Sequence, residues 1–112
     1  MKYRVIPRPE FEKELQPLLK RHHSLTKDLL KLEKQLEERP ATGIGLVHGL
    51  FKIRLAIASK GKSGGARVIT YAATEDHKVY LLSIYDKSDC DTADIESMKQ
   101  LAAELHAPKG NR

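Results

Sequence analysis

The chain of 112 residues has a single cysteine, Cys90, and no hydrophobic run close to the roughly 20 residues that span a bilayer. One cysteine cannot form an internal disulfide and offers no CxxC metal motif, which fits a reducing compartment. The first residues, Met1 to Val5, also lack the apolar segment and the cleavage site of a signal peptide. We therefore expect a cytoplasmic protein in which Cys90 is structural or incidental.

Motifs that fix particular chemistries are missing as well. The stretch from Ala56 to Lys62 loosely matches a phosphate-binding loop, but Ala56 stands where a glycine is needed, and glycines and a strand follow where a helix should begin. The acids around Asp91 lack the spacing of a calcium loop. Five histidines show no HExxH or Cys/His pairing. We expect no nucleotide hydrolysis, no bound metal and no cofactor.

Composition and charge indicate one basic globular domain. Hydrophobic residues make up 40% and charged residues 31% of the chain, a balance typical of a folded protein. We expect residues 1–112 to form a single domain, with 108–112 as a frayed tail. Twenty Lys and Arg against 15 Asp and Glu give a net charge of +5. This charge favours nucleic acid or an acidic protein as a partner only if the cations gather on one surface.

Hydrophobic periodicity predicts a strand and then two helices in the first 40 residues. Residues 3–8 alternate weakly, and Pro9 suits the first turn of a helix. Pro17 should kink or break that helix. Ser24 is the expected N-cap of the second helix, which ends before Pro40. The apolar stripes of the two helices are Phe11, Leu15, Leu18 and Leu19, and Leu25, Leu29, Leu32 and Leu36.

The other side of the second helix carries charges of both signs, which we interpret as a solvated face. From Phe51 the period changes to two, and Ile53, Leu55 and Ile57 continue one buried face of a strand. Runs at 67–71 and 79–85 flank a polar turn at 74–77, as in a hairpin.

Asp91 or Thr92 is the expected cap of a last helix, whose apolar stripe runs from Ile95 to Leu105. The predicted fold is α+β in the order β-α-α-β-β-β-α. An antiparallel sheet is covered on one face by an N-terminal helical hairpin, and its other face stays open.

Cations and one tyrosine are concentrated on the predicted strands and their loops. The group consists of Lys52, Arg54, Lys60, Lys62, Arg67, Tyr85 and Lys87. Residues two apart on a strand share a face, so Lys52 lies beside Arg54, and Tyr85 lies beside Lys87. Charge counting alone leaves two alternatives open, a nucleic-acid site or an exposed face with solubilising cations.

Three blocks in this order resemble the RelE/ParE superfamily, and within it the RelE and HigB toxins. They are GLFKIRL at 49–55, KGKSGGARVI at 60–69 and YLLSIYDK at 80–87. The resemblance implies a RelE-like toxin of a type II toxin–antitoxin system. Such a toxin is an endoribonuclease that enters the ribosomal decoding site, cleaves mRNA there without a metal, inhibits translation and is silenced by its antitoxin.

The resemblance also implies residue roles. Lys52 and Arg54 would assist deprotonation of a ribose 2′-OH, and Arg67 would stabilise the phosphate as it becomes pentacoordinate. Lys87, where the RelE pattern has an arginine, would support charge near the leaving oxygen. The loop cations Lys60 and Lys62 would bind phosphates of the transcript in the ground state.

One departure from the RelE pattern lies near the start of the last helix. RelE-type enzymes often place a tyrosine or histidine there, whereas this chain has Thr92, Ala93 and Ile95. Tyr85 is the substitute we expect, stacking on an RNA base as aromatic side chains do with single-stranded RNA.

Two other functions compete with the nuclease. A ParE-like toxin shares the fold but inhibits DNA gyrase and cleaves nothing. Its sheet needs no convergent cations, so the presence together of Lys52, Arg54, Arg67 and Lys87 favours the nuclease. A basic module that only binds nucleic acid would need a recognition helix or a basic helical stripe, and the predicted helices are mixed in charge.

Overall fold

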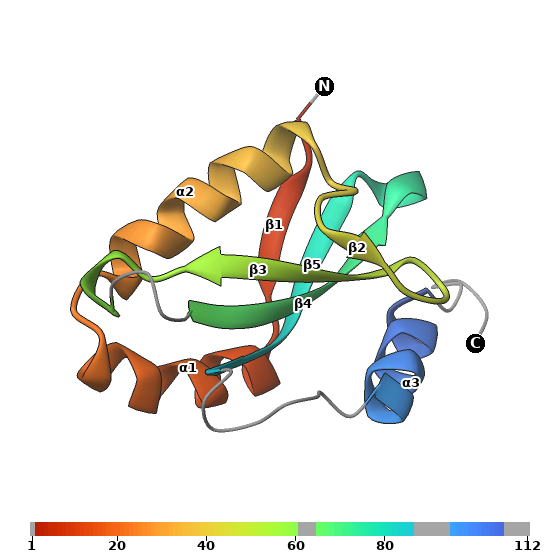
Figure 1. Ribbon diagram of the computed structural model, residues 1–112. Coiled ribbons are helices and arrows are strands. Elements are labelled where there is room, and N and C mark those ends of the chain that lie inside the picture. The colour runs from red at the N-terminus through yellow and green to blue at the C-terminus, as the bar shows by residue number, and fades with distance from the viewer. Residues whose placement is uncertain (1, 61–64, 87–94, 107–112) are drawn as a thin grey trace.

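The computed structural model describes residues 2–60, 65–86 and 95–106, which form three α-helices and a five-stranded sheet in the order β1-β5-β4-β3-β2 (Figure 1). The elements are β1 (Arg4–Pro7), α1 (Pro9–Arg21), α2 (Leu25–Glu38), β2 (Ile44–Gly45), β3 (Leu50–Ala56), β4 (Gly65–Ala73), β5 (Lys78–Asp86) and α3 (Ile95–His106), with short 3₁₀ turns at Ala58–Lys60 and Thr74–Asp76. Within the described residues, no helix is long and apolar enough to cross a membrane.

The predicted α+β class is confirmed, but the sheet is mixed rather than purely antiparallel. β3, β4 and β5 form the expected antiparallel meander, whereas β1 runs parallel to β5, with Arg4 opposite Lys78 and Pro7 opposite Leu81. A long helical connection separates β1 from the meander, so no tight turn forces an antiparallel direction. The two-residue strand β2, which pairs with Phe51 and Lys52, was not predicted.

Pro17 was expected to kink or break the first helix, and the structure shows that it does not break α1. The helix begins with Pro9 in its first turn and continues to Arg21 with Pro17 inside. Phe11 and Leu18 are buried on the side that faces the sheet. Their packing holds the helix together although Pro17 cannot donate a hydrogen bond to the preceding turn.

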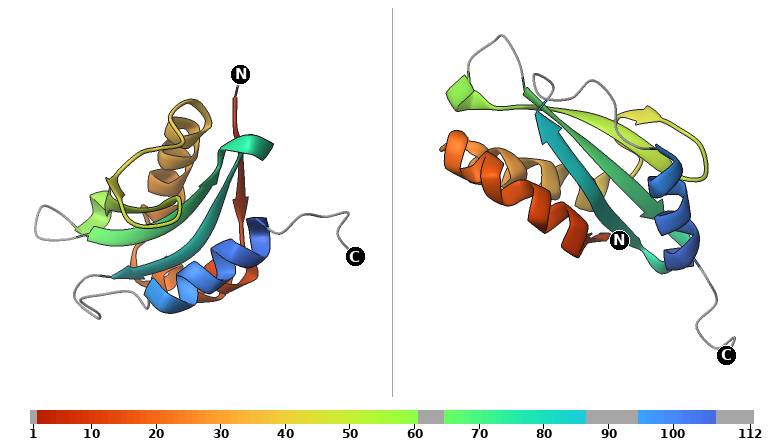
Figure 2. Two further views of the ribbon diagram at one scale, coloured as in Figure 1. Left: turned by 90° about the vertical axis from the view of Figure 1, so that its right-hand side faces the viewer. Right: turned by 90° about the horizontal axis from the view of Figure 1, so that it is seen from below.

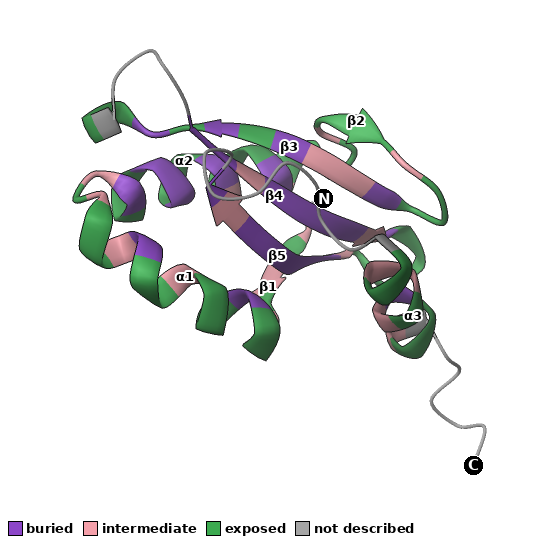
Figure 3. Cartoon of the chain, turned by 60° about the horizontal axis from the view of Figure 1, so that its bottom comes forward, coloured by how far each residue is buried: buried purple, intermediate pink, exposed green. Residues whose placement is uncertain are grey.

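The two sheet faces bury separate apolar clusters. Figure 2 shows how the helices lie around the sheet, and Figure 3 marks the buried segments along the chain. The first cluster packs α1 and α2 on one face and contains Phe11, Leu18, Leu25, Leu29, Leu32, Leu36, Ile53, Leu55, Ile57, Ala66, Val68, Val79, Leu81 and Ile84. The second packs α3 on the opposite face and contains Leu50, Ile69, Tyr71, Ala73, Tyr80, Leu82 and Ala102. The expectation of a fully open second face was therefore wrong.

The termini of the helices agree with the sequence only in part. Ser24 occupies the N-cap position of α2 but makes no capping bond; its hydroxyl donates to the carboxylate of Asp28 at 2.8 Å. The expected caps of α3, Asp91 and Thr92, lie outside the described residues, as does the tail 108–112.

Candidate nucleic-acid interface

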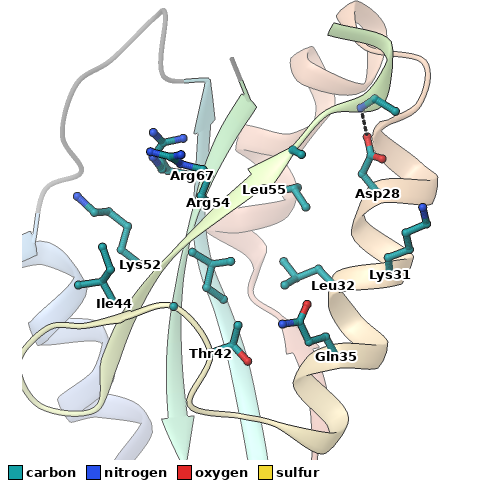
Figure 4. A pocket seen from close by; sticks show the side chains of 14 residues that line it. Asp28, Lys31, Leu32, Gln35, Thr42, Ile44, Lys52, Arg54, Leu55 and Arg67 are labelled. Carbon is teal, nitrogen blue, oxygen red and sulfur yellow. Dashed lines mark hydrogen bonds between the residues drawn. The ribbon is translucent and has the colours of Figure 1, made fainter. Parts of the chain in front are cut away.

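Three side chains form a row across the middle of the sheet. Arg54 of β3 lies opposite Arg67 of β4, and Arg67 lies opposite Tyr85 of β5. Residues directly opposite in an antiparallel pair point to the same face, with Cβ atoms about 5 Å apart. Tyr85 packs against the α3 cluster, so the row lies on the α3 face of the sheet. Figure 4 shows the two guanidinium groups next to each other.

Lys52 adds a third cation on the same face, because it precedes Arg54 by two residues on one strand. Arg54 is exposed, and Lys52 and Arg67 are half-buried. Within the described part of the chain, none of the three forms an ion pair with a carboxylate. Arg67 donates from Nη1 to the carbonyl oxygen of Ala66 at 3.3 Å. Three positive charges thus lie together without neutralisation by these residues.

A groove of about 740 Å³ opens at the outer edge of β3, beside these cations. β2 pairs with β3 only at Phe51 and Lys52, so beyond Lys52 no described strand covers this edge. α2 forms the opposite wall, where Figure 4 shows Lys31 and Gln35. The open edge of β3 and the cations Lys52, Arg54 and Arg67, which we call the cationic row, therefore border one groove.

Gly43 lets the chain after α2 close one end of this groove. Its φ of +98° lies in the region that L side chains rarely adopt. A Cβ atom at Gly43 would lie 2.5 Å from the carbonyl oxygen of Lys52, closer than real contacts allow. Glycine is thus required where this loop passes against β3 and the base of Lys52.

The charge of the groove is positive on balance. Its described lining contains the cations Lys31, Lys52, Arg54 and Arg67 and one acid, Asp28. The Asp28 carboxylate already accepts the Ser24 hydroxyl at 2.8 Å and the Ala58 N–H at 3.2 Å. The groove therefore presents unneutralised positive charge from α2, β3 and β4, which suits a polyanion.

Sequence reasoning missed the contribution of α2 to this groove. The mixed charges of α2 were interpreted as a solvated face, but Asp28 is only 8% exposed and Lys31 lines the groove. The spacing of Asp28, Lys31 and Gln35, at i, i+3 and i+7, was the available signal, since it places them along one side of a helix. That side borders the buried Leu32 and therefore faces β3.

Four of the seven predicted site residues are placed well enough to compare. Lys52, Arg54, Arg67 and Tyr85 come together on one face. Tyr85 is half-buried and its hydroxyl oxygen is enclosed, while its role in stacking on an RNA base stays a prediction. Lys62, Lys87 and the side chain of Lys60 lie outside the described residues.

A second cleft, of about 620 Å³, lies between α3 and the ends of β3 and β4, and its chemistry differs from that of the groove. Its one described Lys, Lys99, pairs with Glu96 at 2.9 Å. Burial, and secondarily Asp76 and Glu75, raise the pKa of Tyr71, which keeps this phenol neutral. The groove along β3 is therefore the stronger candidate for an anionic ligand.

The structure thus defines a small α+β protein with a groove whose described lining is positive on balance. Residues 11–111 match the family model described as the RelE toxin of the RelE/RelB toxin–antitoxin system, and the chain belongs to this RelE family. This membership confirms the resemblance found in the three sequence blocks, and it implies an antitoxin partner.

A solved structure shares the same fold. It is a mutant of the E. coli toxin RelE in which two arginines are replaced by alanine, in the free state. The TM-score is 0.59 and the sequence identity is 16%. The match covers 96% of this chain and 100% of the E. coli chain. The likeness therefore extends over most of this chain, and at this identity it shows the fold.

Proposed function

We propose that this chain is the toxin of a toxin–antitoxin pair and a ribosome-dependent mRNA endoribonuclease. It cleaves mRNA without a metal ion and thereby inhibits translation. The observation that carries the proposal is the convergence of Lys52, Arg54 and Arg67 on adjacent strands beside an open groove. Like charges directly opposite destabilise a sheet, so their presence together favours a role in binding and chemistry over solubility.

The proposed reaction is attack of a ribose 2′-oxygen on the adjacent phosphorus. The O2′–P bond forms and the P–O5′ bond breaks; the 2′-OH gives up a proton and the departing 5′-oxygen takes one. Arg54 stays protonated and stabilises the developing negative charge on the 2′-oxygen. The neutral amine of Lys52 takes the 2′-OH proton, and a water molecule gives a proton to the departing 5′-oxygen. Both groups lie on β3, two residues apart.

Arg67 occupies the centre of the row, between Arg54 and Tyr85. Its guanidinium donates to the non-bridging oxygens of the phosphate as the phosphorus becomes pentacoordinate. Fixed donors aimed at charge that develops in a transition state contribute about 3 kcal/mol each. Lys87 supports charge on the leaving oxygen, and Lys60 and Lys62 bind the flanking phosphates.

We propose that the antitoxin covers the face of the sheet that carries Lys52, Arg54 and Arg67. An acidic or amphipathic segment laid against the sheet, or beside α3, would neutralise Lys52, Arg54 and Arg67 and exclude the transcript. Inhibition would then follow from occupation of the groove rather than from unfolding of the toxin.

Induced expression of the chain alone tests this function. Growth and translation should stop, sequencing of transcript ends should show new cleavages within translated regions, and co-expression of the antitoxin should abolish both effects. A double variant, Lys52→Ala with Arg67→Ala, is the control for cleavage. Growth arrest without new transcript ends, together with trapped DNA gyrase complexes, would instead identify a ParE-like gyrase inhibitor.

A further inference from the structure

The second half of β5 has no strand on its outer side within the described residues. β1 pairs with β5 only from Lys78 to Leu81. Beyond Leu81, helix α1 lies along this edge (Figure 1). The Glu14 carboxylate of α1 accepts the Ser83 hydroxyl at 2.8 Å and the Ile84 N–H at 3.3 Å. A side chain of α1 thus satisfies an edge amide that a neighbouring strand would otherwise bind.

The last residue of β5, Asp86, is held by the end of the same helix. Its side chain is completely buried, with 0% exposure. Arg21, the final residue of α1, donates from Nη2 to Oδ2 of Asp86 at 3.1 Å, and the His22 Nε2 lies 3.1 Å from the same oxygen. A buried carboxylate is costly without such partners, so these contacts specify where the end of β5 lies against α1.

This clamp of Arg21, His22 and Asp86 lies directly behind the cationic row. Asp86 follows Tyr85 in β5, and Asp86 is opposite Ala66 where Tyr85 is opposite Arg67. Neighbouring residues of a strand point to opposite faces. Asp86 therefore points toward α1 while Tyr85 points toward the α3 face. The clamp holds the backbone beneath the row without access to a ligand in the groove.

We propose that Asp86 is a positioning residue of the nuclease site: through Arg21 and His22 it holds the end of β5 so that Tyr85 stays beside Arg67. The expected effect on cleavage rests on the proposed function, whereas the expected effect on the position of Tyr85 does not. Tyr85 lies opposite Arg67 of β4 and directly precedes Asp86, the last residue of β5. Releasing Asp86 frees β5 at the residue that carries this side chain.

Two measurements on Asp86→Ala test the inference. NMR of protein labelled with ¹⁵N throughout and with ¹³C in tyrosine and arginine, with Tyr85 and Arg67 assigned through Tyr85→Phe and Arg67→Lys, should show shifted Tyr85 and Arg67 resonances and faster amide exchange at 84–86. Single-turnover cleavage on programmed ribosomes should slow by about tenfold or more at saturation, with ribosome affinity changed by no more than about threefold. Asp86→Asn keeps the side-chain volume and should give a smaller effect of the same kind.

Matched variants separate positioning from stability. Val79→Ala creates a cavity under the opposite end of β5, where Val79 is fully buried, and should lower the melting temperature without slowing cleavage. Arg21→Ala, at a half-exposed position, should slow cleavage but add little to Asp86→Ala, because both substitutions remove the same ion pair.

The combination of structural and kinetic results is decisive. Unchanged Tyr85 and Arg67 resonances in Asp86→Ala overturn the inference whatever the activity. Shifted resonances with an unchanged cleavage rate overturn it as well, because Tyr85 would then be displaced without consequence. If the wild type cleaves nothing, the proposed nuclease function is rejected. Shifted resonances in Asp86→Ala would then support only the structural role of the clamp in positioning Tyr85.

Discussion

Arg54 and Arg67 face each other across β3 and β4 with the same charge. Like charges in directly opposite positions cost a sheet about 0.2–1 kcal/mol relative to neutral pairs. An anion between them removes this repulsion, whereas the free protein bears it. The pair therefore connects stability to ligand binding at the level of single residues.

Arg54→Thr should consequently stabilise the free protein. Threonine suits a strand, and the repulsion with Arg67 disappears, so we expect the melting temperature to rise by roughly 1–5 °C. Lys52→Thr is the matched control: Lys52 lies opposite Ile69, not a cation, and its replacement should change the melting temperature less. Thermal denaturation followed by circular dichroism measures both. A lower melting temperature for Arg54→Thr would show that the arginine pair is not repulsive.

Substitution of Arg67 distinguishes an effect on the cleavage rate from an effect on ribosome affinity. If it meets charge that develops only in the transition state, Arg67→Ala should lower the single-turnover cleavage rate on programmed ribosomes by about 100-fold or more, with little loss of affinity. Cleavage at the normal rate once the variant is bound would remove Arg67 from the catalytic set, although the family assignment would remain.

The loop cations should behave differently from Arg67. Replacing Lys60 and Lys62 together by alanine should weaken ribosome binding and reduce its salt dependence by roughly one unit of slope for each phosphate that is no longer bound. The rate at saturation should stay close to that of the wild type. Titration at several salt concentrations measures the slope, and an unchanged slope would exclude phosphate binding by these two lysines.

At the scale of elements, α1 performs two tasks. It buries Phe11 and Leu18 against the sheet, and its end carries the contacts of Arg21 and His22 to β5. Pro17 lies between Phe11 and Leu18, exposed to solvent, and the carbonyl of the preceding turn receives no hydrogen bond from it. The helix is thus held by its packing at both ends of an internally weak segment.

Pro17→Ala should therefore raise the free energy of unfolding, by about 1–3 kcal/mol, since alanine restores the missing N–H and no buried surface disappears. Gln16→Ala, at the neighbouring exposed position, is the control and should change stability little. Urea unfolding of the three proteins measures the difference. A less stable Pro17→Ala protein would mean that proline's restriction of the unfolded chain outweighs the strain in the helix.

At the scale of the whole molecule, the net charge of +5 matters because part of it converges on one groove. A convergent field accelerates the approach of an oppositely charged partner, and salt screens it over about 8–10 Å at physiological ionic strength. Under the proposed function, the same groove binds the transcript and an acidic or amphipathic segment of the antitoxin in turn.

Association with the antitoxin should be fast and should slow by about tenfold or more between low and high salt. Lys31→Gln, on the α2 wall of the groove, should reduce this salt dependence, whereas Lys20→Gln, an exposed cation on α1, should not. Stopped-flow mixing at several ionic strengths measures both effects. Salt-independent association of the wild type would show that charge complementarity does not guide recognition.

The sequence alone determined every long element, because each of these is specified by a local pattern, whereas the two-residue strand β2 is not. Four leucines of α2 repeat at helical spacing: Leu25, Leu29, Leu32 and Leu36. Ile53, Leu55 and Ile57 alternate along β3 and just beyond its end, and both sets are buried as this periodicity predicts. Strand alternation also predicted that Lys52 and Arg54 share a face. The three sequence blocks were sufficient to indicate the RelE family.

The tertiary structure alone decided which elements meet. A pattern of apolar residues shows that a face is buried but not which element covers it, so the parallel pairing of β1 and the position of α3 could not be predicted. Polar residues are harder still, since their environment depends on partners distant in sequence: Asp28 is buried by contacts near Ala58, and Asp86 by Arg21, 65 residues away. Such contacts have no local period, because only the packing of α1 and α2 against the sheet brings them together.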